Sequence, residues 1–276
     1  MSGLFTYPVK SLKGISNNEF TVDAFGFAYD RRFMFVDDNN KFVTQRTHPK
    51  LSLISARLLL GSDNLAEALE LTVHDSGVLP QSQTVFPMTL FEEGVSNFCE
   101  VSVWSDVVSS KVLDPIYTKK ISDFLGVRVR LSFMPDSSFR QIDREFFSED
   151  KRVSFADGYP FLLTSEASLT DLNSRLEQPV SMRNFRPNIV ISGGVSAYAE
   201  DVWQRVVIGD ITFELVKPCS RCIMTTVNDR GIKSDNREPL KTLSQYRRNE
   251  FGICFGQNLV HLTQGTIRVG DLVSFE

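Results

Sequence analysis

The stretch Pro218-Cys219-Ser220-Arg221-Cys222 is the most informative part of the sequence, because it places two of the four cysteines three positions apart. Residues 223–227 behind it are apolar and β-branched, which predicts a strand. A redox-active pair of the thioredoxin type normally opens a helix instead, and the helix dipole stabilises its thiolate. Here the charges of Lys217 and Arg221 favour a thiolate, which suits zinc, copper, an iron–sulfur cluster or a heavier thiophilic metal.

Three other interpretations compete for the cysteine pair. A structural zinc site needs roughly four ligands, but Cys99 and Cys254 are single and the three histidines are scattered along the chain. A structural disulfide is disfavoured because the N-terminus lacks the features of a signal peptide, which predicts a reducing, cytoplasmic location. Two inert buried thiols remain the strongest alternative from spacing alone, since free cysteine packs as a small hydrophobe.

The composition is that of a globular protein with an ample core. Hydrophobic residues make up 42% and charged residues 23% of the 276 residues, which is ordinary for one or two domains. No apolar run reaches the roughly 18 residues of a membrane span, so none is expected. The net charge of −4 argues against a nucleic-acid-binding surface.

Short strands dominate the predicted secondary structure. They are expected over 4–7, 32–36, 41–45, 51–60 and 189–191, and as tight hairpins over 206–213 and 267–273. Helices are expected over 116–125 and over 164–176, where Ser165 or Thr164 caps the N-terminus and Leu169, Leu172 and Leu176 line one side. Many strands and few helices predict a mainly β (α+β) fold with barrel-like sheets, and the pattern changes near Asp114-Pro115.

Basic residues stand at the ends of the predicted strands despite the acidic total. Scattered arginines are usually solvated, but five at strand ends suit one anionic ligand, because guanidinium groups bind phosphate well. No phosphate-binding loop of the Gly-x-x-x-x-Gly-Lys-Ser/Thr type is present. The residues alone therefore indicate a pocket for a phosphorylated ligand beside a reactive thiol. The cations concerned are Lys10, Arg31 with Arg32, Arg46, Arg186 and Arg221.

Seven short motifs in one order carry a resemblance that spans nearly the whole chain. Together they resemble the molybdenum cofactor sulfurase C-terminal (MOSC) proteins with an N-terminal β-barrel domain, in particular the amidoxime-reducing components and their bacterial relatives. The resemblance implies a β-barrel domain at 1–115 and a MOSC domain at 116–276. The motifs are Tyr7-Pro8-Val9-Lys10-Ser11, Asp30-Arg31, Asp157-Gly158-Tyr159-Pro160-Phe161, Ser165-Glu166-Ala167-Ser168-Leu169, Phe185-Arg186-Pro187-Asn188, Cys219-Ser220-Arg221-Cys222 and Phe255-Gly256-Gln257-Asn258.

The resemblance implies a mononuclear molybdenum centre held by one pyranopterin and by one protein cysteine. By motif position Cys222 is the metal ligand and the catalytic residue, and Cys219 is its structural neighbour. The positions implied to bind the cofactor are Lys10, Ser11, Arg31, Gly158, Tyr159, Arg186, Asn188, Ser220, Arg221 and Asn258. The implied activity is that of a detoxifying oxidoreductase that removes oxygen from the nitrogen of N-hydroxylated substrates. The residues leave the general acid open among Tyr159, His261 and Asp157.

The source of electrons is expected to lie outside the sequence. No Cys-x₄-Cys-x₂-Cys run and no flavin or nicotinamide fingerprint is present, so no iron–sulfur cluster within this chain is expected. Either a ferredoxin-type or flavoprotein partner supplies electrons, or a C-terminal ferredoxin domain has been removed. The alternative function is a molybdenum cofactor or sulfur carrier that uses a Cys222 persulfide. Binding of pyridoxal phosphate is not expected, which disfavours a complete sulfurase.

Overall fold

The computed structural model describes residues 1–63, 65–74, 82–228 and 230–276 of the chain. Most of its regular structure is strand, which confirms the predicted mainly β class. Its largest sheet has nine strands in the order β19-β14-β15-β17-β12-β13-β1-β2, with β16 paired to β17. These strands are β1 (Gly3–Thr6), β2 (Ile15–Ser16), β12 (Phe161–Ser165), β13 (Ile189–Ile191), β14 (Arg205–Ile208), β15 (Ile211–Ser220), β16 (Arg248–Asn249), β17 (Gly252–His261) and β19 (Val273–Phe275).

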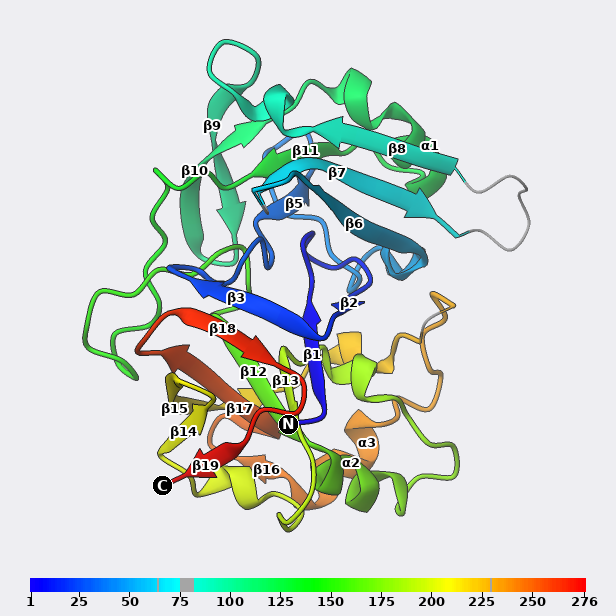
Figure 1. Cartoon of the computed structure of the whole chain (residues 1–276). Helices are drawn as coiled ribbons and strands as arrows, with labels where there is room; N and C mark the ends of the chain where they lie inside the picture. The colour runs from blue at the N-terminus through cyan, green and yellow to red at the C-terminus, as the bar shows by residue number, and fades with distance from the viewer. Residues whose placement is uncertain (64, 75–81, 229) are drawn as a thin grey trace.

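The described residues form three smaller sheets as well. A four-stranded sheet has the order β5-β11-β10-β9, and two three-stranded sheets have the orders β18-β3-β4 and β6-β7-β8. Figure 1 shows the first and third of these at one end of the molecule and the nine-stranded sheet at the other, with β3 and β18 between them. The strands are β3 (Glu19–Asp23), β4 (Gly26–Phe27), β5 (Phe33–Val36), β6 (Ile54–Leu60), β7 (Ala66–Val73), β8 (Ser82–Pro87), β9 (Asn97–Val103), β10 (Asp106–Val112), β11 (Arg130–Phe133) and β18 (Gly265–Arg268).

The central strands form where the sequence is continuously apolar. All three residues of β13 are buried, because the strand lies between β12, to which it runs parallel, and β1. Phe161, Leu163 and Ile189 pack with Phe213 and Leu259 in one hydrophobic cluster. Burial of an aliphatic or phenyl side chain stabilises the fold by about 1.5–3 kcal/mol. This cluster therefore fixes the strands whose ends carry the predicted site residues.

Two segments of the chain pack at the end of the molecule opposite to most of their neighbours in sequence. β1, at the N-terminus, pairs with β13, although most of its sequence neighbours belong to the other sheets. In the opposite sense, Ile121, Leu125 and Leu131 follow residue 115 in sequence, but they pack in the same hydrophobic cluster as Phe33 and Leu69, which precede it. The division into domains at 115/116 is not tested by this packing and stays a prediction.

Three short α-helices lie at the edges of the sheets: α1 (Lys119–Leu125), α2 (Glu166–Asn173) and α3 (Leu240–Tyr246). The predicted cap of α2 is confirmed, because the Ser165 side chain accepts a hydrogen bond from the Ser168 amide. Leu172 is buried with Leu169 and Leu176 against it, as the spacing predicts. The helix expected from residue 116 instead begins at Lys119 and follows a 3₁₀ turn, and Ile116 is 73% exposed.

Four strand predictions are corrected. Residues after the second cysteine form a 3₁₀ helix, Ile223–Thr226, because the hydroxyls of Thr225 and Thr226 each bond a carbonyl three residues back. The hairpin expected over 267–273 does not form, since β18 pairs with β3 and β19 pairs with β14. The strand over 41–45 is reduced to isolated bridges, and 49–53 is a 3₁₀ turn before β6. The hairpin over 206–213 is confirmed.

Candidate functional site

A cavity of about 270 Å³ opens where the ends of several strands and loops meet. Every residue that the resemblance implied as a metal ligand or cofactor contact lines it, although these residues come from all parts of the chain. The structure thus brings the predicted set together, while the role of each member stays a prediction. The set comprises Lys10, Ser11, Arg31, Gly158, Tyr159, Arg186, Asn188, Ser220, Arg221, Cys222 and Asn258.

The two cysteines differ in their surroundings. Both are half-buried free thiols on the cavity wall, between the end of β15 and the 3₁₀ turn that follows. Arg221 donates from Nη1 to the Sγ atom of Cys219 at 2.8 Å. The Sγ atom of Cys222 makes no hydrogen bond with any residue that the structure describes. Of the two sulfurs, Cys222 is therefore the one left free for a ligand.

The strand that carries the cysteines is irregular at this point. Its pairing with β17 shifts register between Leu215 and Lys217 and again between Pro218 and Ser220. Such bulges bend a strand and redirect its side chains. The Asn258 side chain donates to the Lys217 carbonyl at 3.2 Å and so fixes the bent segment from the neighbouring strand. Asn258 acts on this evidence as a support for the cysteine segment.

A lysine and a carboxylate define one part of the cavity. The Lys10 Nζ atom donates to the Phe155 carbonyl and to Asp157 Oδ1, each at 2.6 Å. Burial lowers the pKa of Lys10 to about 8, although Asp157 opposes the shift. The surrounding protein partly desolvates the Asp157 carboxylate, which raises its pKa, but the charges of Lys10 and Arg46 outweigh this effect and hold the pKa below its usual range. Asp157 is thus ionised at neutral pH and cannot serve as a general acid there.

Arg46 extends the same cluster; the sequence placed it among the strand-end cations, but the family resemblance did not include it among the cofactor-binding positions. Its Nη2 atom lies 3.5 Å from Asp157, and its guanidinium lies 4.3 Å from the centre of the Trp104 ring. The indole of Trp104 donates to Asp157 as well, at 3.3 Å. The sequence feature that pointed to Arg46 was its position at the end of a predicted strand, like the other cations.

Arg31 and Arg186 both lie over the Tyr7 ring. Their guanidinium groups lie 4.4 and 4.2 Å from the centre of the Tyr7 ring. Arg31 is fixed by Asp30, which lies 2.6 Å away, and by the Asn188 side chain at 3.1 Å. Arg186 donates from Nη1 to the Leu12 carbonyl at 2.7 Å, and burial lowers its pKa to about 10. Both stay charged at neutral pH.

Three residues of the cavity wall have a strained backbone. Ser11, Arg31 and Arg186 have φ values of 67°, 49° and 56°, in the left-handed region that side chains other than glycine seldom adopt. Each such residue costs on the order of 1–3 kcal/mol and persists only where its surroundings enforce it. All three line the cavity, so the fold gives up stability to hold these side chains in position.

Several buried donors around the cavity have no acceptor within the described protein. They are Arg46 Nη1, Arg186 Nη2, Arg221 Nε and the Tyr159 hydroxyl. Buried donors are normally paired, and one left unpaired costs about 1–3 kcal/mol. A Cβ atom at Gly158 would meet no atom within 4 Å, so the glycine leaves room in the cavity. Unpaired donors, added room and a free thiol together fit a phosphorylated ligand that carries a soft metal.

The two remaining general-acid candidates, His261 and Tyr159, differ in whether they reach the cavity. His261 is fully buried against Phe161 and does not line the cavity, and burial lowers its pKa to about 3. Tyr159 does line the cavity, and burial raises its pKa above the usual range. Tyr159 therefore keeps its proton at neutral pH and is the candidate that lies in the right place.

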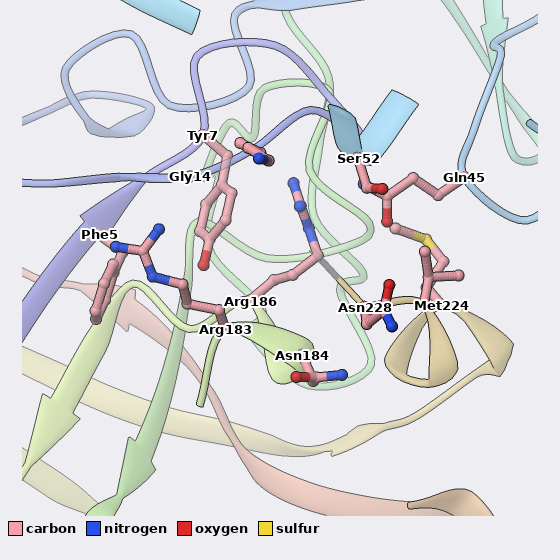
Figure 2. Close-up of a pocket in the computed structure, with 12 residues that line it drawn as sticks. Phe5, Tyr7, Gly14, Gln45, Ser52, Arg183, Asn184, Arg186, Met224 and Asn228 are labelled. Atoms are coloured by element: carbon pink, nitrogen blue, oxygen red, sulfur yellow. The ribbon is translucent and has the colours of Figure 1, made fainter. Parts of the chain in front are cut away.

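A smaller pocket of about 40 Å³ adjoins the cavity and shares Asn184, Arg186 and Met224 with it. Figure 2 shows the Arg186 side chain rising between Tyr7 and Ser52 in this pocket. Arg186 thus forms part of the wall between the two spaces. Asn184 was not identified from the sequence, and its amide donates to the Thr225 carbonyl at 2.9 Å.

Comparison with known proteins shows the family to which the chain belongs. The MOSC domain model matches residues 150–274, and the MOSC N-terminal beta barrel domain model matches residues 1–127. Mitochondrial amidoxime-reducing component 1 of Mus musculus is 38% identical over 288 residues, which cover 98% of this chain and 80% of that protein. The chain belongs to the MOSC family.

Other MOSC relatives extend the comparison. Mitochondrial amidoxime-reducing component 1 of Homo sapiens is 36% identical, with 98% of this chain and 81% of that protein covered. The molybdenum cofactor sulfurase of Oryza sativa subsp. japonica is 29% identical over 93% of this chain but only 32% of its own length. Within the described residues of this MOSC protein, no helix is long and apolar enough to cross a membrane.

Proposed function

We propose that this protein is a molybdenum-cofactor-dependent reductase of N-hydroxylated compounds such as hydroxylaminopurines and amidoximes. The relatives named as amidoxime-reducing components support an oxidoreductase that acts on N-hydroxylated substrates. The observation that carries the proposal is the free thiol of Cys222 on a cavity where several buried donors have no acceptor among the described residues.

The residues around the cavity would divide the binding of the cofactor among them. Cys222 would hold the metal, since of the two sulfurs on the cavity wall it is the one without a hydrogen-bond partner in the described chain. Lys10, Arg31, Arg46 and Arg186 would bind the phosphate and the pterin, and Gly158 leaves room for them. When bound, the group would supply a two-electron couple able to take the oxygen of an N–OH bond.

Other residues would position the cysteine segment and the cavity wall, and one would donate a hydrogen bond to the substrate. Arg221 ties Cys219 to the Phe185 carbonyl and so orients the segment that presents Cys222. The side chains of Asn188 and Asn258 bond to the backbone, which makes them supports for the wall of the cavity. Tyr159 keeps its proton and would donate a hydrogen bond to the substrate.

Electrons would reach the site from a ferredoxin-type or flavoprotein partner, with a small N-hydroxylated compound as substrate. Protein loaded with molybdenum should therefore show no reductase activity with NADH alone. It should form the amine from benzamidoxime or 6-hydroxylaminopurine when reduced viologen is supplied.

The decisive experiment compares Cys222→Ser with Cys219→Ser in protein made by cofactor-competent cells. The Cys222 variant should lose the sulfur-to-metal absorption band and most activity, whereas Cys219→Ser should keep the band. Molybdenum content per chain and the visible spectrum are measured alongside amine formation. A Cys222→Ser protein with the spectrum and activity of wild type would refute the assignment.

A carrier function is the second candidate, and the similarity to a molybdenum cofactor sulfurase favours it. In that case Cys222 would hold a persulfide and pass its sulfur to an acceptor. Loaded protein that reduces neither substrate with reduced viologen, yet transfers sulfur from a Cys222 persulfide, would establish the carrier function instead.

A further inference from the structure

Lys217 is a cation on the cavity wall that the proposed cofactor contacts do not use. It belongs to β15, two residues before Cys219. Its Nζ atom lies 3.9 Å from the centre of the Phe146 ring and 5.1 Å from that of Phe251. The two rings pack edge to face, with centres 5.7 Å apart, so they form one aromatic support.

The electrostatic state of Lys217 differs from that of the other cations of the cavity. Lys10 and Arg46 face Asp157, and Arg31 faces Asp30. Arg186 and Arg221 have no carboxylate partner among the described residues, but each donates a hydrogen bond to a carbonyl, of Leu12 and of Phe185 respectively. In the part of the chain that the structure describes, the Lys217 ammonium has neither an ion pair nor a hydrogen bond. Aromatic faces hold a cation in place by about 0.5–2 kcal/mol, but they do not neutralise its charge.

The backbone of Lys217 is as well fixed as its side chain. The residue pairs with Asn258 across β15 and β17, and the Asn258 amide donates to its carbonyl. Phe146 and Phe251 come from two further segments, one in the 134–160 loop and one at the turn between β16 and β17. Three separate parts of the chain thus cooperate to hold one unpaired ammonium at the cavity, on the strand that leads to Cys222.

We propose that Lys217 recognises an oxyanion on the substrate, so that the site favours N-hydroxylated compounds that carry a carboxylate or a phosphate. The inference rests on the proposed function, because it names the substrate class of the same cavity. An ammonium that is positioned but not neutralised attracts such a group, and a partly buried charge-assisted contact is stronger than a neutral one.

The test compares two matched pairs of substrates with reduced viologen as electron donor. The first pair is benzamidoxime and 4-carboxybenzamidoxime, and the second is 6-hydroxylaminopurine and its riboside monophosphate. The measured quantity is the ratio of kcat/KM for the anionic member to that for the neutral member. In Lys217→Met this ratio should fall about tenfold, which corresponds to a single charge-assisted contact. Lys217→Arg should retain it, and added salt should reduce it in the wild type.

Lys120→Met serves as the matched control, because Lys120 is an exposed lysine on α1 outside the cavity. Binding of 4-carboxybenzamidoxime by isothermal titration gives a readout that does not depend on turnover. Lys217-dependent binding without any turnover would refute the proposed function and leave the anion site standing. Turnover with the same ratio in wild type and Lys217→Met would overturn the inference alone. So would a loss of molybdenum in Lys217→Met, since Lys217 would then bind the cofactor.

Discussion

Lys10 and Asp157 form a close ion pair between a buried ammonium and an exposed carboxylate. The distance from Nζ to Oδ1 is 2.6 Å, and the side chains are 5% and 62% exposed. Lys10 comes from the loop after β1, whereas Asp157 belongs to the loop before β12. The pair therefore joins two of the segments that surround the cavity. It also makes the charge of Lys10 sensitive to pH, because burial lowers its pKa to about 8.

The first prediction concerns pH and the binding of an inorganic anion. Between pH 7 and pH 9 Lys10 passes from mostly charged to mostly neutral, so the affinity for sulfate should fall about tenfold. Sulfate is the probe because its own charge does not change over this interval. Lys10→Arg keeps its charge and should lose less than about twofold in affinity. Tryptophan fluorescence follows the titration, since Trp104 contacts Asp157. Equal losses in both proteins would contradict the role of Lys10.

The lowered pKa of Lys10 also makes the free energy of unfolding depend on pH. The folded pKa of Lys10 lies below its ordinary value of 10.5, so the unfolded chain binds the extra proton between about pH 8 and 10.5. The contribution of Lys10 to the free energy of unfolding therefore rises with pH across that window, and burial of its charge opposes folding below it.

The second prediction concerns Asp30, which is 2% exposed and accepts from the Tyr7 amide at 2.7 Å. Asp30→Ala leaves this amide without its acceptor and removes the carboxylate that pairs with Arg31. The free energy of unfolding should fall by about 3–5 kcal/mol, as expected when one partner of a buried ion pair is removed. Urea denaturation measures the change.

Asp123→Ala is the control for this prediction. Asp123 pairs with Lys119 on α1, and both side chains are largely exposed. Removal of an exposed helix pair should cost at most about 0.5 kcal/mol. Similar losses for the two variants would show that Asp30 does not act as a buried anchor.

The third prediction concerns Gly256 of β17. Its φ is 79°, and a Cβ atom there would lie 2.5 Å from the Leu163 carbonyl oxygen. Gly256→Ala should lower the free energy of unfolding by more than about 2 kcal/mol, because backbone strain adds to the close contact. Gly158→Ala is the comparison, since its Cβ meets no atom within 4 Å and its φ is not positive. It should change stability by less than about 0.5 kcal/mol. A stable Gly256→Ala protein would mean that β12 moves aside.

Much of the site was predictable because its signals are local. Cys222, Arg186 and Asn188 belong to short motifs, and the series of motifs indicated the family. The same motifs contain the predicted site residues that line the cavity. The capped helix α2 and the hairpin between β14 and β15 were likewise encoded in adjacent residues. The metal, the electron donor and the cytoplasmic location stay predictions.

The rest depended on contacts between distant segments. β18 pairs with β3 across more than 240 residues, which no local pattern encodes, and the expected terminal hairpin was wrong for this reason. The turn after Cys222 was predicted as a strand because Thr225 and Thr226 are β-branched, but their hydroxyls bond the backbone instead. The contacts of Arg46 with Asp157, and of Lys217 with Phe146 and Phe251, join residues that are far apart in sequence, so the sequence could single out the two cations but not their partners.

The last prediction concerns Arg186, which has one guanidinium nitrogen bonded to the Leu12 carbonyl and another, Nη2, buried without a partner in the described chain. If Nη2 binds the cofactor, Arg186→Ala should weaken cofactor binding about ten- to a hundredfold, the effect of one lost charge-assisted hydrogen bond. The protein should remain folded, because loss of the side chain also removes the buried donor that lacks an acceptor. Molybdenum per chain under limiting cofactor supply gives the occupancy, and urea denaturation checks the fold.

Arg183→Ala is the matched control for Arg186→Ala, because Arg183 belongs to the same 3₁₀ turn that Arg186 ends. Arg183 is exposed, stacks on Phe5 at 5.6 Å and does not line the larger cavity. Its removal should leave occupancy near that of wild type. Arg186→Lys separates charge from shape, since lysine keeps the charge but loses the planar fork, so its occupancy should lie between the two. Full occupancy in Arg186→Ala would remove Arg186 from the cofactor site and leave its contact with Leu12 as its only function.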